Sequence, residues 1–251
     1  MIPGWFAIAA VRLFPKWQVA TMRSAGEAIT YQGENMKKLI CAAALAVALA
    51  GCVSAPIKTV DSANALQGKT IILSEYAKPD FSAMTAGKAM FGMFGAAAMV
   101  AAGNDLVKKD GIADPSLAVS EKLAQDLKSA RGEKLLLNNI VIAADDNVST
   151  LLKDYPGADL IIDVKTLNWM YSYYPTKWDK YHVFYSARLR VLDGKTGDLV
   201  AQAICKADPT DANNPPTKDQ LLANEGELLK SLLQKAGDNC VKIYEKQILN
   251  V

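Results

Sequence analysis

The residue types that carry catalysis are sparse in this chain of 251 residues. His182 is the one histidine, so a Ser-His-Asp or Cys-His arrangement has no spare base and a two-histidine metal site cannot be built. Gly194-Lys195-Thr196 is similar to the end of a phosphate-binding loop, but Leu189 stands where that loop needs a glycine, so we interpret the segment as a turn. The sequence predicts no catalytic residue, no metal site and no bound cofactor.

Aromatic side chains are dense between residues 169 and 185. The cluster comprises Trp169, Tyr171, Tyr173, Tyr174, Trp178, Tyr181, His182, Phe184 and Tyr185. Rings with polar edges suit protein interfaces, sugar stacking or a bilayer boundary, whereas the same rings also pack across the strands of a hairpin. We take Trp169, Tyr171, Tyr173, Trp178 and Tyr181 as candidate partner contacts. Cross-strand packing is the favoured interpretation for the strand members, and Trp178, in a polar turn, fits either role.

A secretory signal is expected over residues 36–51. Met36 is followed by two lysines, and the chain then runs uncharged from Leu39 to Ala50. A helix of that length reaches about 18 Å, which is too short for a hydrocarbon core of about 30 Å. The pattern therefore indicates a cleaved signal and not a lasting membrane span.

The end of this segment, Leu49-Ala50-Gly51-Cys52, resembles the lipobox of bacterial lipoproteins. The resemblance implies that Cys52 becomes the first residue, with a diacylglyceryl group on its thiol and an acyl chain on its amine. Two or more chains hold a protein stably on a bilayer, whereas one chain binds marginally. Val53 stands where the family's inner-membrane retention signal has Asp, which implies the periplasmic face of the outer membrane. The alternative is that Cys52 is a buried thiol in an apolar helix.

Residues 1–35 precede the positive start of the signal and have no role in this scheme. We interpret them as an upstream extension and expect translation to begin at Met36. The alternative is a membrane-associated helix over residues 2–14.

Charge and composition exclude several classes of function. After residue 51 the chain has 23 Lys and Arg against 24 Asp and Glu. This near-neutral balance predicts no nucleic-acid partner and no polybasic surface for anionic lipid. The apolar fraction of 51% indicates a globular domain with a real core.

Two cysteines remain once Cys41 leaves with the signal and Cys52 takes the lipid. In an oxidising compartment, Cys205 and Cys240 are expected to form a disulfide. Cys205 shares a strand face with Leu199, Ala201 and Ala203, and Cys240 follows Ala236 on the apolar stripe of a helix. The alternatives are two free buried thiols, or a redox or metal pair.

The mature chain is expected to comprise a lipidated tether over 52–68 and a single periplasmic domain over 69–251. Strands are predicted at 69–76, 135–143, 158–174, 181–192 and 199–206, and helices at 115–131, 147–155 and 217–247, the last with a break at Gly237. The last three strands form an antiparallel meander within 158–206. This order predicts an α+β fold in which one mostly antiparallel sheet is covered by helices, including a C-terminal helix.

The segment 86–103 is rich in glycine and alanine, and only Lys88 is charged. Its small residues recur four apart, which lets helices or membrane segments approach closely. One hypothesis is that it enters a bilayer or packs against copies of itself. The favoured hypothesis is a buried helix or apolar loop over the sheet, and four glycines argue against a strong autonomous helix.

The element order resembles the small α/β periplasmic domains of the curli-secretion channel lipoprotein and of the amino-terminal part of the Tol-system periplasmic protein. The phrase Gly157-Ala158-Asp159-Leu160-Ile161-Ile162 carries part of this likeness, which spans residues 68–249. It also extends to uncharacterised outer-membrane lipoproteins, and it implies no catalytic residues.

Three functions remain compatible with the sequence. The first is a non-enzymatic interaction or assembly module of the cell envelope, held on the membrane by its lipid, with a protein partner or self-association. The second is a periplasmic binding module for a glycan or apolar ligand that uses the aromatic hairpin 169–185. The third is an enzyme that works by carboxylates alone.

Overall fold

The computed structural model describes residues 56–62, 65–136 and 141–251. The expected extension 1–35, signal 36–51 and lipidated Cys52 lie outside the described residues, so those expectations stay predictions. Residues 54–251 form one compact unit that buries its own apolar core.

Three long strands form the centre of the sheet. They are β6 (Leu160–Tyr174), β7 (Lys177–Asp193) and β8 (Leu199–Ala207), paired antiparallel in chain order. Their side chains alternate as the sequence indicates, because successive residues of a strand point to opposite faces. Leu160, Ile162 and Val164 are buried on the core face. The predicted meander and α+β class are confirmed.

Short parallel strands extend this sheet in the order β4-β1-β6-β7-β8. The strand β1 (Thr70–Leu73) lies between β6 and β4 (Lys134–Leu135), and β3 (Ser82–Ala83) pairs with the far half of β6. The strand predicted over 69–76 is interrupted at Ser74, whose hydroxyl donates to Asp163 of β6. Beyond it, β2 (Glu75–Tyr76) pairs with β5 (Ile142–Ala143) in a separate two-stranded sheet.

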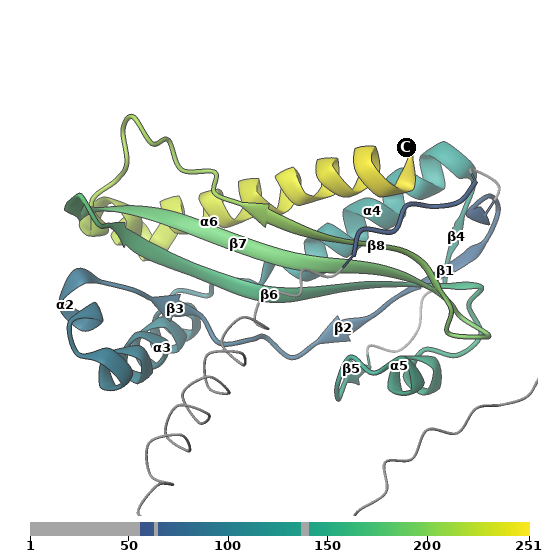
Figure 1. The fold of residues 1–251 in the computed structure, drawn as a ribbon, viewed down its shortest axis with the longest axis horizontal. Coiled ribbons are helices and arrows are strands. Elements are labelled where there is room, and N and C mark those ends of the chain that lie inside the picture. The colour runs from purple at the N-terminus through teal and green to yellow at the C-terminus, as the bar shows by residue number, and fades with distance from the viewer. Residues whose placement is uncertain (1–55, 63–64, 137–140) are drawn as a thin grey trace, which may run out of the picture. The chain divides into compact units, whose positions relative to one another are not determined.

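Two helices cover the core face of the sheet (Figure 1). The helix α4 (Pro115–Arg131) has the expected start and stop: Asp114 caps it, Pro115 occupies its first position, and Gly132 ends it at φ 73°. The helix α6 (Lys218–Tyr244) begins with a capping box of Thr217 and Gln220 and continues into a π-helical turn, Glu245–Leu249.

The break predicted at Gly237 of α6 is wrong. Gly237 is regular helix, and a Cβ there would lie 3.3 Å from Pro115 and Val119, so the glycine permits close packing of α6 on α4. The actual break is at Ala223–Gly226, where Asn224, Glu225 and Gly226 have positive φ.

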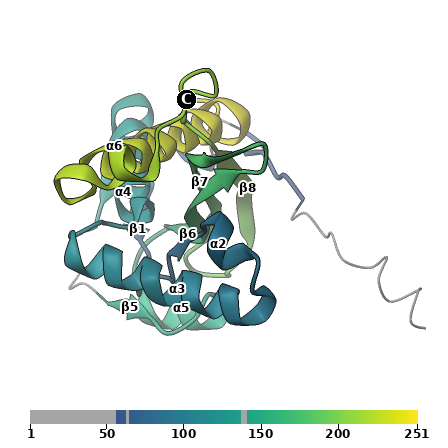
Figure 2. The same cartoon turned by 90° about the vertical axis from the view of Figure 1, so that its left-hand side faces the viewer.

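The opposite side of the sheet is covered unevenly (Figure 2). The helix α5 (Val148–Asp154) packs a second apolar cluster against one half of it, with Leu151, Tyr155 and Ile161 buried. The helices α2 (Ala86–Ala89) and α3 (Gly92–Lys109) lie along β3 at the other half.

Part of the segment that was expected to be a tether, 52–68, packs on the domain. Lys58 pairs with Gln202 of β8, the Val60 amide donates to the Ile248 carbonyl, and Val60 and Leu66 are buried. The described residues of this segment, 56–62 and 65–68, therefore belong to the domain, because their backbone and side chains are used in packing.

Candidate functional site

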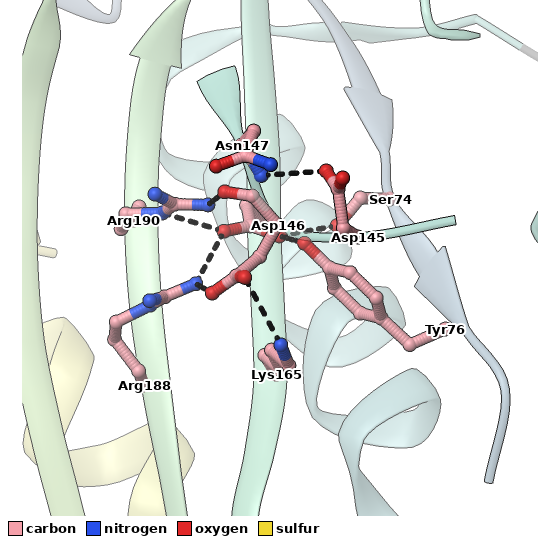
Figure 3. A network of polar contacts seen from close by, with 9 residues as sticks. Ser74, Tyr76, Asp145, Asp146, Asn147, Lys165, Arg188 and Arg190 are labelled. Atoms are coloured by element: carbon pink, nitrogen blue, oxygen red, sulfur yellow. Dashed lines mark hydrogen bonds and ion pairs between the residues drawn. The ribbon is translucent and has the colours of Figure 1, made fainter. Parts of the chain in front are cut away.

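A charged cluster lies on the sheet face that β2, β5 and α5 cover (Figure 3). At its centre the carboxylate of Asp163 is fully buried. It accepts hydrogen bonds from the Ser74 hydroxyl (2.8 Å), from the Tyr76 hydroxyl, and from Nε of Arg190 (2.7 Å), and it lies 3.3 Å from Nη2 of Arg188. A buried carboxylate with this many donors is compensated and has little capacity left for chemistry.

The second carboxylate of the cluster is Asp146, just before α5. It forms ion pairs with Arg188 at 2.9 Å and Lys165 at 3.2 Å, while its backbone carbonyl accepts from Arg190 at 2.7 Å. Burial opposes ionisation of Asp146, but the hydrogen bonds from Lys165 and Arg188 prevail and lower its pKa. Burial, together with the nearby Asp163, raises the pKa of Tyr76. Both pKa values are shifted away from neutral pH, so neither Asp146 nor Tyr76 is suited to act as a base or nucleophile there. The cluster instead holds β2 and α5 against the sheet.

His182 lies in a second polar arrangement on the same face of the sheet. Its Nδ1 is 2.5 Å from a carboxylate oxygen of Asp208, and its ring stacks on Tyr174 at 4.7 Å between centroids. Among the described residues, no group of three or more His, Cys, Asp or Glu could hold a metal ion. The His182–Asp208 pair therefore holds the start of the 208–216 loop against β7.

Three of the five candidate partner contacts belong to the core. Trp169, Tyr171 and Tyr181 are between 0% and 6% exposed, and Phe81 packs edge-on against Trp169 at 4.9 Å. Burial raises the pKa of Tyr171 to about 12. These three rings belong to the main core because odd-numbered positions point inward in β7 and, after the bulge between Thr166 and Asn168, in β6 as well. No partner therefore reaches them in the folded domain. Their candidacy as partner contacts is corrected to a packing role.

The other two candidate contacts keep surface. Tyr173 is partly buried against the core, and Trp178, the second residue of β7, is 64% exposed. The Trp178 indole donates to the Pro175 carbonyl at 2.8 Å, which holds the ring in place without covering it. Trp178 is therefore the predicted contact that is most accessible to a partner.

The largest exposed apolar group of the described residues lies at the junction of α2 and α3. Met90 is 78% exposed, Phe91 71%, Met93 87% and Phe94 87%. We call these four residues the α2–α3 surface. Large apolar side chains scattered singly are normal on proteins, but four within five positions form a patch of the kind that marks interaction sites.

Small residues at the helix contacts explain why the large side chains of this junction are exposed. The Thr85 hydroxyl caps α2, and a Cβ at Gly95 would overlap the Lys88 carbonyl at 1.9 Å, so α2 folds tightly back on α3. Gly103 likewise lets α3 approach the backbone of Phe81, and Met99 and Val107 fill the buried stripe. Since small residues are used for these contacts, the large ones point to solvent. The favoured expectation of a buried segment over 86–103 is wrong for this half of the helix.

The cysteine pair forms a disulfide in the structure. Cys205 of β8 and Cys240 of α6 are bonded at 2.01 Å, with their Cα atoms 5.4 Å apart. Both are buried, on the phases that the sequence indicates. The bond ties the C-terminal helix to the edge of the meander.

A groove of about 340 Å³ runs between the start of α4 and the middle of α6. Ile112, Pro115, Val119, Leu233 and Val241 line its floor. Its polar residues provide no nucleophile or metal ligand set, and Asp114 is already used as the α4 cap and as a partner of Thr166. In the part of the chain that the structure describes, no helix is both long and apolar enough to span a bilayer.

No protein-family model and no curated protein matches the sequence. Solved structures do match it. A hypothetical protein from Chlamydia trachomatis is 11% identical, with a TM-score of 0.39, over 74% of this chain and 99% of that one. An uncharacterised lipoprotein from Nitrosomonas europaea is 10% identical, with a TM-score of 0.33, over 78% and 88%. A lipoprotein from Neisseria meningitidis is 14% identical, with a TM-score of 0.24, over 69% and 97%. Scores this low carry no argument about function, which therefore rests on the geometry above.

Proposed function

We propose that this protein is a non-enzymatic interaction module of the cell envelope, held on the periplasmic face of the outer membrane by lipid chains on Cys52. The α2–α3 surface is the observation that carries the proposal. It exposes two methionines and two phenylalanines, whereas Trp169, Tyr171 and Tyr181 of the aromatic hairpin are packed inside. Leaving such residues in water is unfavourable by about 1.5–3 kcal/mol per side chain relative to burial, so a partner that covers them gains that free energy.

The charged residues support a non-enzymatic role. Asp163 and Asp146 are neutralised by arginine and lysine side chains, and His182 is paired with Asp208. Catalytic carboxylates need a pKa near the working pH and an approach for substrate. Asp163 is fully buried and offers no approach for a substrate, and the pKa of Asp146 is lowered, away from neutral pH.

The proposed lipid anchor would hold the domain close to the bilayer. The described chain is already docked on β8 at Lys58, and Pro56 stands four positions after Cys52. Four extended residues span at most about 14 Å. An acylated Cys52 would therefore keep the domain against the membrane instead of letting it range on a long tether.

Burial of three aromatic rings weakens the alternative of a glycan-binding hairpin. Stacking on a sugar needs exposed ring faces, and Trp169, Tyr171 and Tyr181 have none. Tyr173, Tyr174 and Phe184 are half-buried, so Trp178 is the one ring of the hairpin that is largely exposed.

Mass spectrometry of the protein purified from membranes tests the anchor. The expected product begins at Cys52, carries acyl chains and contains the Cys205–Cys240 bond. A water-soluble, unacylated product that keeps residues 36–51 would contradict the anchor.

Crosslinking in intact cells tests the interaction module. A photoreactive residue at position 94 is expected to give a specific adduct, and the same group at Leu167, which is exposed on β6, serves as the control. Equal labelling from both positions would contradict a role for the α2–α3 surface.

A further inference from the structure

The helix α3 is packed against the domain along one side only. Its buried stripe consists of residues that recur four apart: Gly95, Met99, Gly103 and Val107. With about 3.6 residues per turn, Phe94, Ala97 and Ala101 lie on the side opposite this stripe, and all three are exposed. Figures 1 and 2 show α3 at the surface of the domain, with α2 folded beside it. Among the described residues nothing covers the outer side of α3, so the fold leaves an apolar helix face open.

The two halves of this face differ in the size of their side chains. Met93 and Phe94, each 87% exposed, stand at its start, and the exposed alanines Ala97 and Ala101 follow one and two turns later. The first exposed charge beyond them is Asp105. Such a face has projections at one end and a recess beside them, so a copy of it turned end for end is complementary to it.

We infer that α3 pairs antiparallel with α3 of a second copy of the chain, about a twofold axis between Ala97 and Ala98. In this arrangement Phe94 of each copy packs against Ala101 of the other, because positions equally spaced on either side of the axis meet. Alanines at the axis let the two helices approach to about 8–10 Å between their axes. The inference rests on the proposed function and names the partner of the α2–α3 surface as another copy.

The apolar area of this face suits a pair of copies. A large apolar side chain carries on the order of 200 Å² of surface, so the four residues of the α2–α3 surface, between 71% and 87% exposed, present roughly 600 Å². The exposed alanines of α3 bring the face close to about 800 Å², which is what each partner buries in an interface of standard size. Two copies anchored on one membrane would also meet at a high effective concentration.

The charges at this end of the domain do not oppose a symmetric pair. Lys88 lies close to Lys218 at the start of α6, whereas Asp208 and Asp211 lie close to Tyr174 at the end of β6. A symmetric contact brings equal groups together, so a rim of one sign would repel its copy. A rim of both signs has no such surplus, and it gives anionic lipid no excess of positive charge to bind. Burial of the apolar face therefore decides the contact.

Cysteine trapping with residues 54–251 tests the inference. This unit packs its own core, so it can be produced without residues 1–53. Its two cysteines are joined in the buried Cys205–Cys240 bond, so an introduced cysteine is the one free thiol. With copper phenanthroline as oxidant, Ala97→Cys is expected to give a disulfide-linked dimer, because the two copies of position 97 flank the axis. Leu167→Cys, at an exposed position of β6, is the control and should stay monomeric.

A mixture of two variants tests the direction of the pair. Phe94→Cys and Ala101→Cys domains are expected to link to each other at least about tenfold more than either links to itself, because an antiparallel pair brings position 94 of one copy to position 101 of the other. Self-linked products from both variants in place of the mixed product would overturn the antiparallel arrangement.

Sedimentation of the parent domain at increasing concentration measures the affinity. The parent is expected to pass from monomer to dimer. Met93→Ser/Phe94→Ser is expected to raise the dissociation constant of the dimer by at least about a hundredfold, because the pair loses four apolar side chains at once. Both side chains are 87% exposed, so thermal unfolding of the monomeric variant should match that of the monomeric parent. Leu167→Ser, which removes an exposed apolar side chain of β6, should dimerise like the parent.

A parent domain that stays monomeric, and whose Ala97→Cys variant gives no more dimer than Leu167→Cys, would overturn the inference. So would a dimer that Met93→Ser/Phe94→Ser leaves intact. Photocrosslinking from position 94 in intact cells separates the inference from the proposed function. An adduct of twice the subunit mass supports both. A specific adduct with a different protein supports the interaction module and contradicts the pairing of copies.

Discussion

The β6–β7 hairpin and the α2–α3 junction are both crowded with large apolar side chains, and the fold treats them in opposite ways. The hairpin rings Trp169, Tyr171 and Tyr181 are buried under α4 and α6, whereas Met93 and Phe94 are almost fully exposed. The difference lies in the neighbours. A central strand has a helix layer across its face, but the outer face of α3 has no element across it in the described part of the chain. Aromatic density alone therefore does not identify a contact surface.

The two tryptophans of the domain give the largest expected contrast. Trp169→Ala should lower the free energy of unfolding by about 3–5 kcal/mol, because a fully buried ring is replaced by a cavity. Trp178→Ala is the matched control and should change it by less than about 0.5 kcal/mol. Urea denaturation of the two variants measures both. Similar losses for both would break the contrast between buried and exposed rings.

The disulfide is the next largest contribution and belongs to the buried region. Cys205→Ala/Cys240→Ala opens a link between residues 35 apart, which should cost about 3.8 kcal/mol in the chain-entropy model. The loss should appear in thermal or urea unfolding, and a reducing agent should give a similar loss for the parent domain. A stable reduced domain would argue that the bond is dispensable for this packing.

A glycine in α3 connects the two regions. A Cβ at Gly103 would lie 1.9 Å from the Phe81 carbonyl, so Gly103→Ala should push α3 off β3 and cost about 2 kcal/mol by overpacking. Gly87 has no neighbouring atom within 4 Å, so Gly87→Ala in α2 should be neutral or slightly stabilising. Thermal unfolding compares them. Equal stability of the two variants would mean that α3 does not pack as closely as the structure has it.

The smallest expected effect is a pH dependence at the opposite end of the domain. Burial and the neighbouring Asp126 raise the pKa of Glu245 to about 7, while the pKa of Asp126 is lowered: burial opposes that shift, and hydrogen bonds with Glu245 and Lys122 outweigh it. A carboxyl whose pKa is higher in the folded state favours folding when protonated. Its contribution is complete below about pH 4.5 and is lost as the pH rises through about 7.

Glu245→Gln removes this titration. The unfolding free energy of the parent should fall between about pH 4.5 and 7 relative to that of the variant, and the two curves should run parallel above about pH 8. A constant difference across this range would show that Glu245 ionises with an ordinary pKa.

Sequence patterns predicted most of the fold. The alternation of residues 160–165, the turn at 193–198, the cap at Asp114-Pro115 and the phases of Cys205 and Cys240 are local signals, and the structure has each of them. The short parallel strands were harder to predict, because β3 and β4 have two residues each and exist only by pairing with a distant partner. Gly237 was misread as a break because a glycine used for helix packing looks the same as one that ends a helix.

The sequence pointed to the segment that contains the α2–α3 surface, but the favoured prediction was that this segment is buried. The segment 86–103 stood out for its small residues, whereas the residues that form the exposed surface are the large ones at 90–94. Positions 95, 99, 103 and 107 recur four apart and form the buried stripe, so Met93 and Phe94 lie off that stripe. That spacing was visible in the sequence.

Photocrosslinking of the full-length protein in the intact envelope, from positions 94, 178 and 167, decides whether the α2–α3 surface is the contact face of the domain. Strong adducts are expected from position 94, weaker ones from position 178, and none above background from position 167. Adducts from position 167 together with silence at position 94 would show that the envelope meets a different face of this domain.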